Sequence, residues 1–461
     1  MSKTFSGIVQ ISNVSDYILP SQGCIIPLKN DKKEETVGEV PIKIKSSSNF
    51  NKKKESRNKV KISLNDCLSC NGCVTSAEVL LIESQTTEEM LRGLKESKIS
   101  IVTLSPQSIT SIARNKNISV SEAARLVCSY FYKNGATYII DSSFGRYISL
   151  EKSFEEFKNI YGNKSKLPLI CSICPGFVCY AEKTHGKLLV SHLSKVRSPQ
   201  GMNSLLVKYY FASKNNLNPK DIYHASVMPC YDKKLEASRN DFVMDDGTKE
   251  VDCVIGTNEL NQILENFDYT NDCRNDTDNH QNNTNWLNRL NYGNVIGGIS
   301  DPSGGYSKYI ITKSTTTIFA DKDVYVKEEV KSKDLTVFEI VDTASGKILL
   351  TAANIFGFKN IQNVVQKIKR NKCTYDYIEV MACPSGCTNG SAQIRGELVA
   401  DRVSNLQAIN DMYISIPSVP DAEDEVKELV AEWPINKSSF DTSFHIIDSN
   451  VLNLNTVSNM F

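Results

Sequence analysis

Three cysteines within seven residues constrain this chain more than any other feature of its sequence. Cys67, Cys70 and Cys73 are separated by two residues each in the run DCLSCNGC. Two-residue spacers curl the backbone so that three thiolates converge, and the small Ser69 and Gly72 permit that curl. Structural zinc usually takes its ligands as two separated pairs, whereas a run of three favours a [4Fe–4S] cluster. We therefore expect a metal centre here, with a fourth thiolate from elsewhere in the chain.

The fourth thiolate of this first centre is expected from Cys24, which lies upstream in SQGCIIP. Every other cysteine lies beyond a predicted core strand, so Cys24 is the natural candidate. The alternative is that Cys24 is an unligated thiol in a flexible arm.

The cysteine count and the start of the chain indicate a compartment. The chain has 14 cysteines among 461 residues, and its start, MSKTFSGIVQISN, lacks the basic and apolar regions of a secretory signal. Clustered cysteines without a signal favour metal ligation in a reducing compartment over disulfides, so we expect a cytoplasmic protein, with the nucleus as a further location. No apolar run approaches the roughly 18–20 residues of a membrane span. Because 53 basic residues balance 53 acidic ones, no net field favours direct contact with nucleic acid or a membrane.

Short β-branched runs alternate with helical segments from about residue 98 onwards. KISIVTL is followed by SEAARLVCSYFYKNG, ATYIID, LPLICSI, SLLVKYYFASKNN, IYHASVM and VDCVIG. The alternation resumes later with TVFEIVD, GKILLTA, a helical stretch over residues 360–372 and DYIEVM. Strands that alternate with helices at this spacing predict parallel α/β layers, and the interruption predicts two lobes.

Composition suggests where the segments of the chain begin and end. We expect an N-terminal arm with Cys24 and a basic linker at 1–60, the iron–sulfur motif at 61–95, a first α/β lobe at 96–266, an Asn- and Asp-rich disordered insert at 267–290, a second α/β lobe at 291–410, and a C-terminal helix and tail at 411–461. The glycine-rich GGISDPSGGY (297–306) lacks the strand-then-helix spacing of a dinucleotide site, so we interpret it as a tight turn.

A second, dispersed group of cysteines follows predicted strands. Cys174 in CSICPG, Cys230 in VMPCYD, and Cys383 with Cys387 in VMACPSGC each stand where a predicted strand ends. Sites in α/β folds assemble at the carboxyl ends of strands, so residues far apart in the chain can meet in one cleft. With Gly386 between them, the last two thiols can point at one metal site. The alternative is coincidence, because free cysteine is among the most buried residue types.

Other cysteines are expected to be structural or have no assignment. Cys128 lies in a helical pattern and Cys253 in a strand pattern, which predicts two buried small apolar groups. Cys171 and Cys179 flank the second group and stay unassigned.

Four segments, in their order along the chain, resemble a known family. ISLNDCLSCNGCVTSAE, CPGFVCYAEKTHG, MPCYDKKLEASR and EVMACPSGCTNG are similar to signature segments of the cytosolic iron–sulfur assembly factors related to iron-only hydrogenases, also called the nuclear prelamin A recognition factor-like family. The similarity extends from about residue 61 to residue 395. It implies an iron-only-hydrogenase-like α/β fold of two lobes, with mainly parallel sheets flanked by helices, preceded by a small N-terminal iron–sulfur segment.

The resemblance also implies two [4Fe–4S] clusters. The first would be held by Cys24, Cys67, Cys70 and Cys73, and the second by Cys174, Cys230, Cys383 and Cys387. In the hydrogenase relatives, the second set of four fixes a cubane and its attached di-iron centre.

This chain departs from the hydrogenases at two places and matches them at a third position. Ile173 occupies the position where active hydrogenases have a cysteine as proton relay, and an aliphatic side chain cannot transfer protons. The segment at 389–393 replaces a glycine-rich stretch that is typical of the hydrogenases and of many assembly-factor members, which puts in doubt the close backbone approach that bare glycines allow. Lys233 matches a lysine that contacts ligands of the di-iron centre in hydrogenases, and its alternative role is to neutralise cluster charge.

These departures favour a protein that is not an enzyme. We expect a component of cytosolic iron–sulfur cluster assembly that acts as adaptor or scaffold in the transfer or targeting of [4Fe–4S] clusters to cytosolic and nuclear apoproteins. The alternative is a redox enzyme with hydrogenase-like or unknown electron-transfer activity. The resemblance implies docking to a WD40-repeat protein and other subunits of the cytosolic iron–sulfur targeting complex, with apoprotein clients engaged indirectly. The chain ends in Asn459-Met460-Phe461, so a tail-mediated contact through the terminal aromatic residue is a further hypothesis.

Overall fold

The computed structural model describes residues 76–163, 166–267, 287, 290, 293–295, 301–395, 399–416, 428, 430–432 and 440–447. The four cysteines predicted for the first centre lie outside the described residues: Cys24, Cys67, Cys70 and Cys73. Most of the predicted insert at 267–290 and of the C-terminal helix and tail lies outside them as well.

The first sheet is parallel throughout and has the strand order β2-β1-β4-β5. Its strands are β1 (Ile99–Leu104), β2 (Tyr138–Asp141), β4 (Ile222–Met228) and β5 (Cys253–Gly256). One face packs on α2 (Thr87–Glu96), α3 (Pro106–Lys116), α4 (Val120–Lys133) and α10 (Thr257–Leu264), and the other on the π-helical η4 (Leu206–Phe211) and α8 (Ala212–Lys214). Because both faces are covered, the strands are nearly continuous apolar runs, as the sequence indicated.

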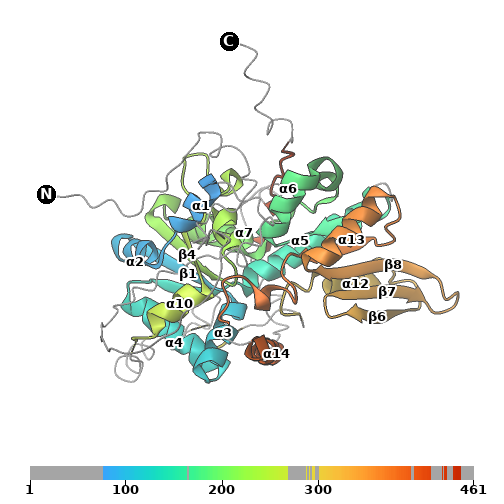
Figure 1. Ribbon diagram of the computed structural model, residues 1–461. Helices are drawn as coiled ribbons and strands as arrows, with labels where there is room; N and C mark the ends of the chain where they lie inside the picture. The colour runs from blue at the N-terminus through green and yellow to red at the C-terminus, as the bar shows by residue number, and fades with distance from the viewer. Residues whose placement is uncertain are drawn as a thin grey trace, which may run out of the picture.

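The second sheet is mixed and has the order β3-β9-β8-β7-β6. The parallel part contains β3 (Leu169–Cys171), β9 (Tyr377–Met381) and β8 (Ile348–Phe356), and the antiparallel part continues with β7 (Leu335–Asp342) and β6 (Val324–Ser332). Helices α5 (Ser143–Tyr161) and α12 (Tyr306–Thr317) pack on one face, and α6 (Pro175–Leu189) and α13 (Phe358–Lys369) pack on the other. In Figure 1 the first sheet lies on the left and the antiparallel strands project to the right.

The remaining elements connect these layers. They are α1 (Ser76–Glu83), η3 (Val190–His192), α7 (Pro199–Leu205), η5 (Pro219–Asp221), α9 (Asp232–Ala237), η6 (Asn240–Phe242), η9 (Cys387–Asn389) and α14 (Val399–Ile414).

Local sequence signals explain two of the helix boundaries. Ser119 and Glu122 form a capping box at the start of α4, and Asn117 ends α3 in the left-handed conformation. None of the described helices is long and apolar enough to span a membrane.

The predicted α/β fold with flanking helices is confirmed, with two differences in detail. Half of the second sheet is antiparallel, and its edge strand β6 was not predicted because VYVKEEVKS has no regular apolar alternation. Strand β3 lies within residues 96–266 but pairs with β9 of the second sheet. The chain therefore crosses between the sheets, and the segment boundaries given above stay a prediction.

Candidate metal centre

The four dispersed cysteines all follow strand ends in the structure. Cys174 comes after β3 and is the N-cap of α6, while Cys230 lies between β4 and α9. Cys383 follows β9, and Cys387 begins η9. Since β4 belongs to the first sheet and β3 and β9 to the second, the four residues come from both halves of the fold.

The tertiary structure brings the four thiols together. The Cys383 thiol interacts electrostatically with those of Cys174, Cys230 and Cys387. Cys230 in turn interacts with Cys174 and Cys387. Burial is the largest cause that raises the pKa of each thiol, and it raises the pKa of Cys387 to about 12. Without a compensating positive charge, these thiols would keep their protons at neutral pH.

The donor set fits an iron–sulfur cluster. Four sulfur donors are the usual ligands of such clusters, and a bound metal deprotonates its thiols outright. In the described part of the chain, no group of three or more His, Cys, Asp or Glu side chains is placed to hold a single metal ion. Cys174 and Cys383 are 8% and 6% exposed, and Cys230 and Cys387 are half-buried. The four thiols therefore form one group that is largely shielded from solvent.

The positively charged side chain of Lys233 lies beside the thiols. Lys233 lowers the pKa values of Cys174, Cys230 and Cys387, although in each case burial outweighs it. Its Nζ lies 2.7 Å from Glu236 Oε2, and both side chains are nearly buried. Asp232 acts in the opposite direction on Cys230. The site thus has a paired buried cation that can partly offset the negative charge of four thiolates.

The turn between Cys383 and Cys387 requires glycine. Gly386 has φ +76°, and its N–H donates to Cys383 O at 3.1 Å. The N–H of Cys387 donates to Ser303 Oγ at 3.0 Å. A Cβ on Gly386 would overlap Ser303 Oγ and lie 2.5 Å from Ser303 Cβ. Only a residue without a side chain therefore allows Ser303 to hold Cys387 in this position.

Ser303 belongs to the glycine-rich segment that we interpreted as a tight turn. The structure gives this segment a further role, because residues 301–305 lie against the cysteine turn. Arg146 Nη2 donates to Asp301 O at 2.7 Å, and Gly305 N–H donates to Glu379 Oε1 at 3.0 Å. Burial raises the pKa of the Glu379 carboxyl, Asp301 raises it further, and Arg146 opposes both. The local sequence signal for this network is Glu379, an acidic residue within the otherwise apolar strand β9.

The segment after Cys387 keeps a close backbone approach. A Cβ on Gly390 would overlap Pro229 O and lie 2.9 Å from the Pro229 carbonyl carbon. Ala392 N–H donates to that same oxygen at 3.1 Å, and Tyr231 N–H donates to Ser391 Oγ at 3.1 Å. The segment therefore holds the backbone next to Cys230 in place.

The other cysteines are mostly buried in packed regions. Cys128 and Cys253 are 3% and 0% exposed in the core beside the first sheet, which confirms the prediction for both. Cys171 packs in the core between α5, α12 and the second sheet, and burial raises its pKa. Cys179 is buried on α6 and interacts with Arg239. Ile173 packs against apolar cores on both faces of the second sheet.

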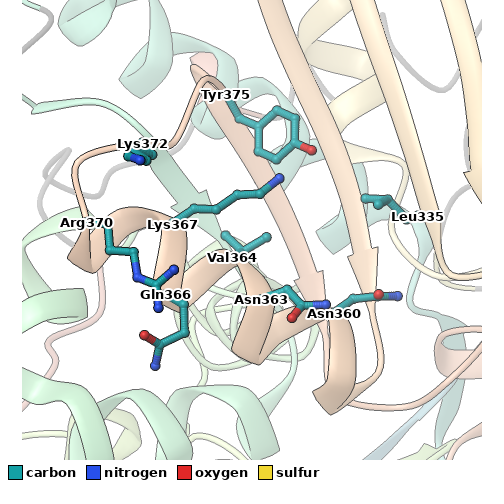
Figure 2. A pocket seen from close by; sticks show the side chains of 9 residues that line it. All are labelled: Leu335, Asn360, Asn363, Val364, Gln366, Lys367, Arg370, Lys372 and Tyr375. Carbon is teal, nitrogen blue, oxygen red and sulfur yellow. The ribbon is translucent and has the colours of Figure 1, made fainter.

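A pocket of about 340 Å³ lies beside α13 (Figure 2). Asn360, Asn363, Val364, Gln366 and Lys367 of α13 line it together with Leu335, Arg370, Lys372 and Tyr375. None of these residues is a cysteine, and Lys367 Nζ lies 5.4 Å from the centroid of the Tyr375 ring. The pocket is therefore not part of the candidate metal centre.

Known proteins resemble this chain over most of its length. A probable cytosolic Fe-S cluster assembly factor of Brugia malayi is 44% identical over 94% of this chain and 92% of its own length. The cytosolic iron-sulfur assembly component 3 of Pongo abelii is 37% identical over 94% of each chain. Among solved structures, a variant of the [FeFe]-hydrogenase HydA1 from Chlamydomonas reinhardtii has a TM-score of 0.60 at 21% identity and covers 78% of this chain and 98% of its own. At that identity the likeness shows the fold alone.

Residues 98–391 match the family described as "Iron only hydrogenase large subunit, C-terminal domain", which covers both sheets and all four dispersed cysteines. The full-length relatives extend the similarity to almost the whole chain. The chain therefore belongs to the family of cytosolic Fe-S cluster assembly factors, within the wider family of iron only hydrogenase large-subunit domains.

Proposed function

We propose that this chain is a [4Fe–4S] protein that acts as an adaptor or scaffold in the transfer or targeting of clusters to cytosolic and nuclear apoproteins. The observation that supports this most is the meeting of four largely buried thiols from two sheets, in a chain whose relatives are named cytosolic Fe-S cluster assembly factors. Once deprotonated, these thiols can hold an iron–sulfur cluster, and a cluster held in this way can be passed on or reduced.

Two clusters are proposed. Cys174, Cys230, Cys383 and Cys387 would hold the one between the lobes, and Cys24, Cys67, Cys70 and Cys73 would hold the other. A [4Fe–4S] cluster supplies one-electron redox chemistry or a transferable unit when bound. At the second site, the chain itself contributes the thiols, the nearby Lys233 charge and a turn that is held by Ser303.

A non-catalytic role is supported by the residue before Cys174. Ile173 has no group that exchanges protons, and its side chain packs against apolar cores. A hydrogenase-like redox enzyme is the second candidate, because the fold is that of the [FeFe]-hydrogenases. An assay for hydrogen evolution or uptake by the reconstituted protein separates the two, since the adaptor role needs neither.

The proposed partners follow from the same family. We propose that the chain docks to a WD40-repeat protein and other subunits of the cytosolic iron–sulfur targeting complex, that it works in the cytoplasm and also in the nucleus, and that apoproteins are engaged indirectly. If Phe461 contributes to docking, its deletion will weaken capture of the WD40 protein. Capture that is unchanged by the deletion would contradict the tail contact while leaving the adaptor role standing.

The metal content tests the cluster assignment directly. Iron and acid-labile sulfide are measured after anaerobic reconstitution of the wild type, Cys70→Ala and Cys383→Ala, together with electron paramagnetic resonance of the reduced proteins. We expect about eight irons per chain in the wild type and a loss of about four in each variant. Cys373→Ala is the matched control because Cys373 is half-buried and outside both sets. Zinc in place of iron, or a variant with unchanged content, would contradict the assignment.

A cellular complementation experiment tests the adaptor role. Cells depleted of the protein receive either the wild type or Cys383→Ala, and the activity of a cytosolic [4Fe–4S] enzyme is measured against that of a mitochondrial one. We expect the wild type to restore the cytosolic activity and the variant to fail, with the mitochondrial activity unchanged. Full rescue by the variant would refute a role for the second site in assembly.

A further inference from the structure

Strand β6 presents a long open edge of the second sheet. It is the last strand in the sheet order, and among the described residues its ladder pairs with β7 alone (Figure 1). All of its residues after Val324 are exposed. The outer side of such a strand leaves a row of backbone N–H and C=O groups that another strand can pair with.

The exposed side chains of β6 include apolar residues as well as charged ones. Val326 and Val330 are 46% and 67% exposed, and Tyr325 is 51% exposed. Charged residues lie between and beside them: Lys327, Glu328, Glu329 and Lys331. Charges on an edge strand normally prevent indiscriminate pairing, whereas charges that match in one register allow specific pairing.

The order of these residues is self-complementary. We propose that two copies of this chain pair antiparallel through β6, about a two-fold axis at Glu328, so that their two sheets join into one. This arrangement places Lys327 of each copy opposite Glu329 of the other, and Val326 opposite Val330. Opposite charges and apolar residues that face each other directly across two strands stabilise the pair. The contact is isologous, so each favourable pair occurs twice.

Neighbouring registers are less favourable. Side chains alternate between the faces of a strand, so a two-fold axis normal to the sheet can lie only at a residue that faces itself. With the axis at Lys327, Val326 would lie opposite Glu328. With the axis at Glu329, Glu328 would lie opposite Val330 within the regular part of the strand. The proposed register has one unfavourable contact, in which Glu328 faces its own copy, and this contact limits the affinity of the dimer.

Lys327 and Glu329 already belong to a row of exposed charges on one face of the sheet, where Glu329 Oε2 lies 3.9 Å from Lys331 Nζ. Lys327 Nζ lies 3.3 Å from Glu339 Oε2 on β7, which draws the ammonium along the sheet face. Glu329 lies on the same face as Lys327, two residues along the strand, and its side chain is 49% exposed. A second copy would therefore extend an existing row of alternating charges on that face.

Complementary charge changes test the register. Sedimentation velocity is measured over a concentration series on the full chain after anaerobic reconstitution, for the wild type, Lys327→Glu and Glu329→Lys. We expect the wild type to dimerise and each single variant to associate about tenfold more weakly or not at all, because both cross-strand ion pairs become like-charge pairs. An equimolar mixture of the two variants should associate like the wild type, since a carboxylate at one of these positions then faces an ammonium at the other in both cross-strand pairs.

Two further variants complete the test. Glu328→Thr should tighten the dimer, because it removes the like-charge contact at the axis. Lys98→Glu is the matched control, since it makes the same charge change at an exposed lysine next to β1 and should leave association unchanged. A wild type that stays monomeric throughout the series, or a mixture that associates no better than its two components, would overturn the proposal. The outcome is independent of cluster transfer and so does not depend on the proposed function.

Discussion

Replacing Gly386 by alanine should destroy the second metal centre. Gly386 lies in the turn from Cys383 to Cys387 at φ +76° and ψ −156°, a backbone region that residues other than glycine rarely adopt. The new methyl group would overlap Ser303 Oγ, the acceptor of the Cys387 N–H bond. Either Ser303 or the turn must move, and both movements separate Cys387 from the other thiols.

The structure supplies a matched control for the backbone strain. Gly357 has φ +77° and ψ 144°, and the atom nearest to a Cβ there is Pro384 Cγ at 3.6 Å. Gly357→Ala therefore tests the strain without the overlap, at about 1–3 kcal/mol of unfolding free energy. Gly386→Ala adds the loss of a partly buried hydrogen bond, about 0.5–1.5 kcal/mol more, together with the overlap itself. The difference between the variants isolates the contact with Ser303.

Iron content and urea unfolding measure the two effects. We expect Gly357→Ala to keep its iron, and Gly386→Ala to lose about four irons per chain after anaerobic reconstitution. Ser303→Gly in the Gly386→Ala background removes both overlapping atoms and should restore part of the iron. The reasoning is refuted if Gly386→Ala retains the full iron content and is destabilised no more than Gly357→Ala.

Of three further predictions, two concern buried ionisable groups and one concerns a helix cap. His224 is buried and neutral with its pKa lowered to about 3, so as the pH falls through 6.5 the unfolded chain takes up a proton that the folded chain does not. The free energy of unfolding should therefore fall, with a slope that approaches about 1.4 kcal/mol per pH unit below about pH 6, and His224→Gln should flatten that slope in urea titrations. Lys233→Met leaves the Glu236 carboxylate buried without its lysine partner, and should lower the free energy of unfolding by about 3–5 kcal/mol. The double variant Lys233→Met with Glu236→Gln should lower it clearly less. Equal losses would contradict the pairing. Ser119→Ala removes the N-cap of α4 and should cost about 0.5–2 kcal/mol while iron content stays unchanged.

The fold could be predicted where its signals are local. Strand β1 is buried on both faces and is an apolar run, and helix α4 begins at a capping box that the sequence itself contains. Strand β6 could not be predicted in this way because its residues are exposed and its place in the sheet depends on pairing with β7. The same reason explains β3: three residues have too little pattern to show which sheet they join.

The candidate site, like the fold, has features that local sequence indicated and others that only the tertiary structure showed. Cysteine spacing and strand ends, both local properties, indicated which residues are the candidate ligands of the proposed second cluster. Only the tertiary structure could show that Ser303 holds Cys387, that Gly386 must lack a side chain, and that Glu379 and Arg146 fasten residues 301–305 against the turn. These contacts join residues far apart in the chain, so no local pattern of amino acids encodes them. The sequence by itself indicated the candidate ligands and the alternation of elements, whereas the tertiary structure decided what positions those residues, because positioning depends on which strand ends meet.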